Sequence, residues 1–361
     1  NTISIEYQDL LNANLSGHYQ LENASVSHQN NLWNTTAKVQ LPETVGQSIV
    51  FNGKMEISAE SMLLKAWQWQ LKTDDVILPT ILEQVDLHGI HVEQGTAAVI
   101  LKAKGLGQKF NEISAELSLV DANLIAVDES LKAEPVAISQ VKGLFSWQQN
   151  DQGWLVSGRD VLLDINNEQW PTTNFTVKQD ASGFLTAETD YLRLSDLSSI
   201  ALLTKALPED LRKQKPAGDL SSLHLEYSRE QGIRSLAMTL KDFSVLPWQD
   251  TPGVSGLSAT VDWRDGVATV DLDSHQLTLY PEKWLKDAVF FESASGQLRW
   301  QQDLDWQVEV SALQLWNDDF SLHLDGNLKH ENGITNSDLM LKMDHVEVSR
   351  WKHYVPQKIL D

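Results

Sequence analysis

Strict alternation of apolar and polar residues is the feature of this sequence that most restricts its fold. In the run 67–71, tryptophan and leucine alternate with glutamine, and the same period of two returns at 114–119, 222–227, 306–311 and 320–325. Successive side chains of a β-strand point to opposite faces, so each run predicts a strand with one apolar and one polar face.

Turn residues lie between these runs at short intervals. Asp265-Gly266 separates the runs 259–263 and 267–272, and Asn332-Gly333 follows the run 322–329. Asp-Gly and Asn-Gly favour the tight turns of β-hairpins, which join antiparallel neighbours. The sequence therefore predicts a mostly β protein: a long antiparallel, twisted and curled β-sheet with a few short connecting helices. A sandwich of two sheets would show the same local pattern, and it stays open at this point.

One hairpin pattern returns late in the chain. Gly-Leu-Phe-Ser-Trp-Gln-Gln at 143–149 is echoed by Gly-Gln-Leu-Arg-Trp-Gln-Gln at 296–302. Further on, 192–195 is echoed by 346–349. Repeated units stack and form one extended surface, which favours the curled sheet over the sandwich.

The repeat also organises the expected domains. We expect a first β-groove segment at 1–195 and a second at 196–361, with the repeated hairpin unit 143–195 echoed by 296–350. Short helical segments that separate the repeated units are expected near 195–214 and 349–360. Ser195 and Ser349 are the expected helix caps there, because a serine hydroxyl can accept a hydrogen bond from the first turn.

Composition narrows the possible functions. The chain has 361 residues, an apolar fraction of 42% and a formal charge of −22. Binding to nucleic acid needs clustered lysine and arginine, so no nucleic-acid partner is expected. There are no cysteines, which excludes disulfides, thiolate metal sites and cysteine nucleophiles.

Sequence signatures of catalysis and of metal or cofactor binding are missing. His88 and His91 lack the glutamate of metalloprotease spacing, and 253–256 is not a nucleophile elbow. No loop has the pattern that cradles a phosphate. We therefore expect no enzyme, no cofactor and no metal. A carboxylate pair of a glycosidase depends on distance in space, so a carbohydrate-binding or carbohydrate-active β-protein remains an alternative.

Thirteen tryptophans are present. They can serve cross-strand packing, or together they can form the wall of a groove for apolar or amphipathic ligands. Eight of them fit strands or strand ends: Trp33, Trp67, Trp69, Trp147, Trp154, Trp263, Trp300 and Trp306.

Several segments carry a resemblance to a known family. They are Gln-Leu-Pro-Glu-Thr-Val-Gly at 40–46, Leu-Pro-Glu-Asp-Leu at 207–211 with Pro-Ala-Gly-Asp-Leu at 216–220, and Pro-Gly-Val-Ser-Gly-Leu at 252–257 before the Asp265-Gly266 hairpin. With these segments the chain resembles the YhdP branch of the AsmA-like proteins, relatives of TamB, from Leu41 to the C-terminus. None of the motifs is a catalytic signature.

The resemblance implies a periplasmic location, in a protein that is anchored in the bacterial inner membrane. It implies a long β-groove, apolar on its concave face, that carries phospholipid between the inner and outer membranes and so maintains the outer-membrane barrier. This sequence would be an internal portion of that bridge. The implied partners are phospholipids, the two membranes through parts outside this sequence, and further unidentified envelope proteins.

The apolar positions of the alternating runs are the candidate lipid-groove residues. They are Leu117, Leu119, Leu225, Val270, Leu272, Leu298, Val308, Val310, Leu322, Leu324, Leu339 and Leu341. A structural or adhesive β-repeat protein with a closed core is the principal alternative, since its strands would alternate in the same way.

Overall fold

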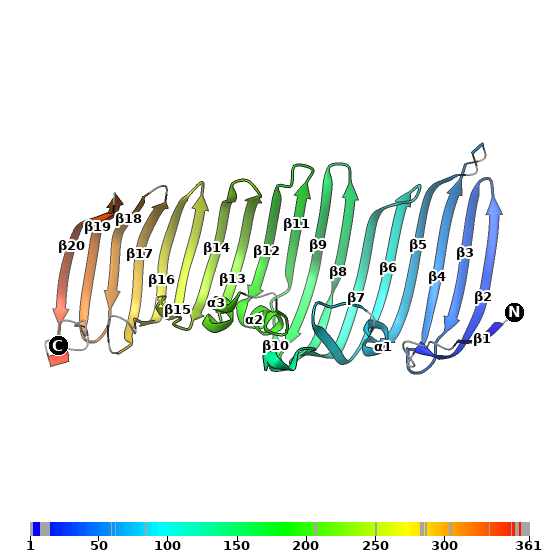
Figure 1. Ribbon diagram of the computed structural model, residues 1–361, viewed down its shortest axis with the longest axis horizontal. Helices are drawn as coiled ribbons and strands as arrows, with labels where there is room; N and C mark the ends of the chain where they lie inside the picture. The colour runs from blue at the N-terminus through cyan, green and yellow to red at the C-terminus, as the bar shows by residue number, and fades with distance from the viewer. Residues whose placement is uncertain are drawn as a thin grey trace. The chain divides into compact units, whose positions relative to one another are not determined.

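The computed structural model describes residues 3–7, 15–58, 60–61, 63–83, 85–205, 208–249, 251–281, 285, 287–302, 305–331, 333–347, 349–350 and 354. Twenty strands and a few short helices make up these residues, and every strand pairing is antiparallel (Figure 1). The expected mostly β fold is confirmed. The strands belong to two compact units, one of Asn1–Ser182 with Ser199–Lys205 and one of Gly183–Ser198 with Ala206–Asp361.

The first unit is an open sheet in which most strands pair with the next strand in sequence. β1 pairs with β2, and β10 and β11 both pair with β9. Its helical segments are α1 (Leu78–Leu82) and the single turn η2 (Glu129–Leu131). The strands are β1 (Ile3–Tyr7), β2 (Gly17–Gln29), β3 (Leu32–Gln40), β4 (Ser48–Ile57), β5 (Leu64–Ile77), β6 (Ile90–Leu106), β7 (Lys109–Ala126), β8 (Val136–Asn150), β9 (Gly153–Ile165), β10 (Glu168–Gln169) and β11 (Thr173–Asp180).

The second unit is a meander in which each strand pairs with the next. The strands are β12 (Leu185–Arg193), β13 (Ala217–Ser228), β14 (Gly232–Val245), β15 (Gly253–Arg264), β16 (Val267–Tyr280), β17 (Val289–Gln302), β18 (Trp306–Trp316), β19 (Phe320–Glu331) and β20 (Ile334–Val346). The predicted Asp265-Gly266 turn joins β15 to β16, as expected.

Short helices interrupt the meander where proline and serine predict them, but the observed helix ends differ from the expected ones. α2 (Leu194–Leu202) begins one residue before Ser195, so Ser195 lies in the first turn and is not the residue before the helix. α3 (Glu209–Gln214) follows Pro208, whose fixed φ suits a helix start. Most of the second expected helical stretch, 349–360, lies outside the described residues. The compact units divide mainly at 182/183. The domain boundary predicted from the sequence at 195/196 is not tested by this division and stays a prediction.

Bulges interrupt many strands part of the way along and bend them. Asn23, Asp242 and Ala312 adopt positive φ at register shifts of β2, β14 and β18. The bulge frees a backbone amide, and a side chain of the adjacent strand accepts its hydrogen bond. Ser258 Oγ accepts from Asp242 N at 3.1 Å, and Asp325 Oδ1 accepts from Ala312 N at 2.7 Å. Bulged strands bend and twist more strongly, so these positions contribute to the curl.

The strands of each unit end at two different edges. At the hairpin edge, drawn uppermost in Figure 1, short turns join β2 to β3, β6 to β7, β8 to β9, β15 to β16 and β19 to β20. At the helix-bearing edge most connections are longer, and they carry α1 and η2 in the first unit and α3 in the second.

The fully buried side chains gather toward the helix-bearing edge. In the first unit Val136, Leu203 and Trp170 are at most 3% exposed. In the second unit a cluster is formed by Leu277, Val289, Phe291, Ala294 and Phe320. Each unit thus has its core along one edge of its sheet.

Candidate functional site

In the first unit, strand register gathers apolar side chains on one face of the sheet. Leu117 lies opposite Val99 and Gly143, and Leu119 lies opposite Ala97 and Val141. Residues directly opposite each other in adjacent strands point to the same face. A neighbouring row across six strands, β3 to β8, contains Ala37, Phe51, Leu71, Leu101, Ala115 and Phe145. We call this side of each unit its apolar face.

The second unit has an apolar face built in the same way. One row across β13 to β19 contains Leu225, Leu236, Trp263, Ala268, Trp300, Val308 and Leu328. The next row, across β14 to β20, contains Met238, Val261, Val270, Leu298, Val310, Gly326 and Leu339.

The remaining predicted residues lie in rows of the same face. Leu272 is opposite Ala259 and Gly296. Leu322 is opposite Leu315 and Met343, and Leu324 is opposite Leu313 and Leu341. The ten candidates of the second unit therefore share one face, and the two of the first unit share the face described above. Their contact with lipid stays a prediction.

Most of these candidates are only half-buried. Val310 is 6% exposed, whereas Leu339 and Leu341, on β20, are 41% and 57% exposed. Among the described residues no second sheet lies over this face in either unit. Apolar area left in water costs about 25 cal/mol per Å², so an apolar ligand that covers this face would be stabilised there.

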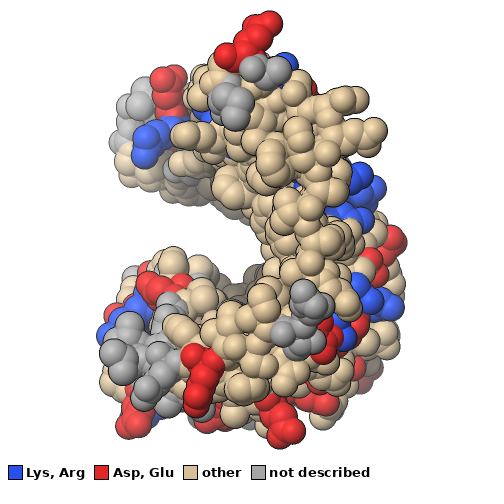
Figure 2. Space-filling model, turned by 90° about the vertical axis from the view of Figure 1, so that its right-hand side faces the viewer, with Lys and Arg blue, Asp and Glu red and all other residues tan. Residues whose placement is uncertain are grey.

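The opposite face carries the charges. Lys38, Lys72 and Lys102 alternate with apolar residues along β3, β5 and β6. Figure 2 looks onto the N-terminal end of the first unit and shows a deep hollow with few charged groups on its wall. Lysine, arginine and acidic residues gather on the outer side and at the lips. The apolar face of this unit therefore lines the hollow, and its polar face is the outer one.

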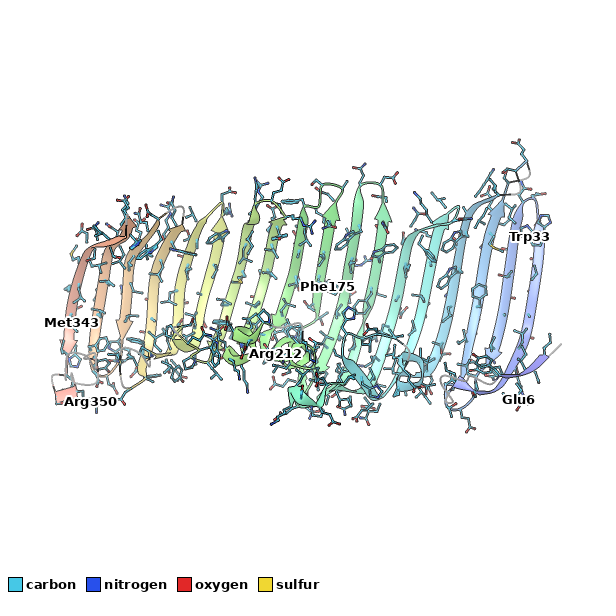
Figure 3. All side chains as sticks on the ribbon, viewed as in Figure 1. Glu6, Trp33, Phe175, Arg212, Met343 and Arg350 are labelled. Atoms are coloured by element: carbon cyan, nitrogen blue, oxygen red, sulfur yellow. The ribbon has the colours of Figure 1, made fainter. Side chains whose placement is uncertain are left out.

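The eight tryptophans predicted in strands all lie on the apolar faces. Trp69, Ala103, Ile113 and Trp147 form one row, and Trp33 belongs to the next row toward the turns. Seven of the eight are half-buried, and Trp300 is 37% exposed. In Figure 3, Trp33 lies beside the hairpin edge and Phe175 lies farther down its strand. The sequence predicted their strands but not their shared edge.

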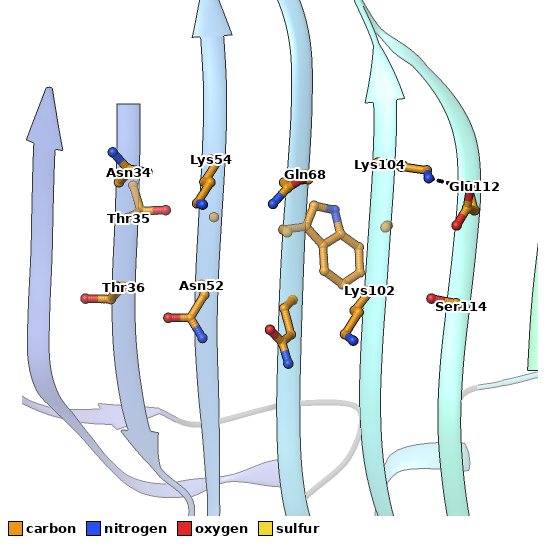
Figure 4. A pocket seen from close by; sticks show the side chains of 14 residues that line it. Asn34, Thr35, Thr36, Asn52, Lys54, Gln68, Lys102, Lys104, Glu112 and Ser114 are labelled. Atoms are coloured by element: carbon orange, nitrogen blue, oxygen red, sulfur yellow. Dashed lines mark ion pairs between the residues drawn. The ribbon is translucent and has the colours of Figure 1, made fainter. Parts of the chain in front are cut away.

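Two depressions mark the outer face of β3 to β7. One, of about 520 Å³, is lined mainly by amide, hydroxyl and lysine side chains, among them Asn52, Gln68 and Lys102 (Figure 4). Lys104 Nζ lies 2.6 Å from Glu112 Oε2 at its rim. The other, of about 470 Å³, adjoins it. We assign no reaction to either depression.

Charged groups cluster at the helix-bearing edge of the second unit. Tyr191 Oη donates to Asp219 Oδ1 at 2.7 Å, and Arg193 lies within 3.8 Å of both Asp196 and Asp219. Burial and the bond to Asp219 raise the pKa of Tyr191 from 10.0 to about 12. These contacts join β12 to β13 and to the start of α2, which is a structural role.

A second ion pair lies at the same edge of the first unit. Lys205 Nζ lies 2.5 Å from Asp128 Oδ2. The hydrogen bonds from Lys205 and Ser130 lower the pKa of Asp128 from 3.8 to about 2. This pair joins the loop before η2 to the segment 199–205.

The described part of the chain holds neither a cluster of metal ligands nor a long apolar helix. No group of three or more histidine, aspartate or glutamate side chains there could hold a metal ion. His88 lies near Asp86, and both are exposed. Within the described ranges, no helix has the length and apolar character needed to cross a membrane.

The family model described as YhdP protein matches residues 1–361. No curated protein and no solved structure matches the chain.

Proposed function

This chain belongs to the YhdP family, and from that premise we propose that its apolar faces shield the acyl chains of phospholipids on their way between the inner and outer membranes. The proposed place is the periplasm, in a longer protein anchored in the inner membrane. Phospholipids are the proposed cargo, and both membranes and other envelope proteins are proposed partners. No enzymatic step is part of this role.

The observation that carries the proposal is the half-exposed apolar face. A phospholipid with two acyl chains has roughly 30 methylenes, and exposing them to water costs on the order of 25 kcal/mol at about 0.8 kcal/mol each. A row of leucine, valine and phenylalanine side chains can offset that cost along the whole face. A polar groove cannot.

The net charge of −22 fits a carrier of amphipathic cargo. Charged side chains on the outer face keep the protein in water, while the lipid headgroups stay hydrated. The same charge opposes adhesion of this segment to an anionic membrane surface.

Two observations favour this proposal over its two alternatives. A sandwich with a closed core would need a second sheet over the apolar face, and the described strands form no second sheet. A carbohydrate-active site needs carboxylates beside exposed tryptophan. Asp271 and Gln297, which hydrogen-bond at 2.7 Å, lie on the polar face, while Trp263 and Trp300 lie on the other.

A photo-crosslinking pair tests the proposal. A photoreactive amino acid at Leu117 should crosslink to lipid in the bacterial envelope, because its side chain points to the apolar face. The same group at Glu116, the next residue on the opposite face, is the matched control. Mass spectrometry of the purified protein identifies the crosslinked lipid. Equal labelling at the two positions, or labelling at neither, would overturn the proposed function.

A further inference from the structure

In each unit by itself, the tryptophans of the apolar face lie close to the hairpin edge. In the first unit Trp33 and Trp154 come directly after hairpin turns, and Trp147 comes shortly before one. In the second unit Trp263 and Trp300 come shortly before hairpin turns and Trp306 begins β18. The two units show the same arrangement independently.

Other tryptophans do not follow this pattern. Trp170 is 3% exposed in the core, and Trp316 is 44% exposed on the polar face at the opposite end of β18. Trp248 lies after β14, with its indole donating to Asp210. Among the described residues, tryptophan on an apolar face of the strands is therefore confined to the hairpin edge.

Several indoles are held in place by neighbours. Trp67 Nε1 donates to the Gly107 carbonyl at 3.1 Å, and its ring meets Phe110 at 4.8 Å between centroids. The rings of Trp263 and Trp300 lie 5.5 Å apart. The fixed indoles form a row near the hairpin edge in which the ring carbons are apolar and the N–H groups are polar.

Farther from the hairpin edge the apolar faces change character. Moving down β8 from Trp147, the face presents Phe145, Gly143 and Val141, and the facing residues of β7 are alanine and leucine. The stretch from Trp147 to Val141 spans roughly 20 Å at about 3.3 Å per residue. One leaflet of bilayer hydrocarbon is about 15 Å deep, half of a core of about 30 Å.

This order matches the order of groups in a phospholipid. Tryptophan is enriched where membrane lipids pass from headgroup to hydrocarbon, because its ring is apolar and its N–H is polar. We infer that the hairpin edge is the headgroup edge. The headgroup and glycerol esters lie at the tryptophan row, and the acyl chains run along the strands toward the helix-bearing edge.

This inference rests on the proposed function, and fluorescence quenching separates the two. The whole chain is loaded with phosphatidylcholine that carries bromine either near the ester end or near the methyl end of its acyl chains. Bromine quenches tryptophan at short range. Bound lipid is quantified by mass spectrometry in the same samples. Bromine near the esters should quench more strongly per bound lipid.

Single tryptophan substitutions identify which tryptophans the bromine quenches. Trp147→Phe and Trp300→Phe should each lose part of the quenchable fluorescence, whereas Trp316→Phe, on the polar face, should keep it. Stronger or equal quenching by bromine near the methyl end, with lipid bound, would overturn the orientation and leave the proposed function intact. The absence of bound lipid would overturn both.

Discussion

The hairpin edge and the helix-bearing edge are the two ends of the same strands, yet on the apolar faces they bury side chains in different ways. At the helix-bearing edge, Leu203 and Ala294 are fully buried and Val136 is 1% exposed. At the hairpin edge, large apolar side chains such as Trp300 and Tyr227 stay 37% and 41% exposed. The difference separates the part of each sheet that stabilises the fold from the part that remains available to a ligand.

The longer connections account for this difference. Tight turns add few residues at the end of a strand, whereas the longer connections add residues that pack: α1 contacts β5 and β6, and Leu203 is fully buried. A protein whose apolar face must stay open can still fold, because burial along one edge contributes the hydrophobic stabilisation.

Core truncation should show the largest effect. Phe291→Ala removes a ring that is 4% exposed and packs edge to face against Phe320. Filled cores lose about 3–5 kcal/mol for such a change. Trp300→Ala at the hairpin edge should cost less, because a ring that is 37% exposed removes less of its area from water and leaves no closed cavity behind. Urea unfolding of both variants measures this, and equal losses would contradict the comparison.

A charge placed in the middle of the apolar face should impair transport more than folding. In Leu225→Asp or Val308→Lys the new charge can stay hydrated on a half-exposed face, while acyl chains must still pass it. A closed face would instead lose several kcal/mol. Melting temperature and envelope-barrier function of the full-length protein are the paired readouts.

The control for this pair is Glu309→Gln on the polar face, which should change neither readout. Severe unfolding of Leu225→Asp would favour a filled core. Normal folding together with a normal envelope barrier would argue against the groove at that position.

Alkaline sensitivity should belong to the helix-bearing edge of the second unit. The pKa of Tyr191 is raised from 10.0 to about 12 in the folded state. Its contribution to stability is therefore complete below pH 10 and is lost as the pH rises toward 12. Tyr191→Phe should flatten the stability profile over this window, as measured by urea unfolding. A profile unchanged by Tyr191→Phe would show that the tyrosine does not titrate in this way.

The smallest effect is expected from the acid titration of Asp128. Its pKa falls from 3.8 to about 2 on folding, so its contribution is present above pH 4 and is lost as the pH drops toward 2. Asp128→Asn should reduce the decline of melting temperature in that range slightly. Glu309→Gln, which lies in the second unit, is the reference. A decline unchanged in Asp128→Asn would remove the ion pair as a source of acid sensitivity.

Much of this architecture could be predicted from alternation. The period of two assigned all twelve groove candidates to faces, and Asp265-Gly266 located a hairpin. Bulges could have reversed these assignments. They did not, because the sequence skips one residue where a strand bulges: Val310 and Leu313, on either side of Ala312, are three apart and share a face.

Other features depended on distances that a sequence does not contain. The ion pair of Asp128 with Lys205 joins residues far apart in the chain. The outer depressions depend on the register of five strands. The position of the tryptophans near the hairpin edge could not be predicted, because it depends on where each strand begins and ends. The first helix end was also missed, since α2 begins at Leu194 while Ser195 was expected to precede the helix.

Pairing between neighbours in sequence has a consequence for biosynthesis. In the second unit every strand from β13 to β19 pairs with the strand before it and the strand after it. Such a unit can assemble hairpin by hairpin as the chain leaves the ribosome, since few contacts wait for distant residues. Each partial product, however, presents an unpaired strand border and an uncovered apolar side. We therefore expect nascent chains of this kind to depend on chaperones until the last strand has joined.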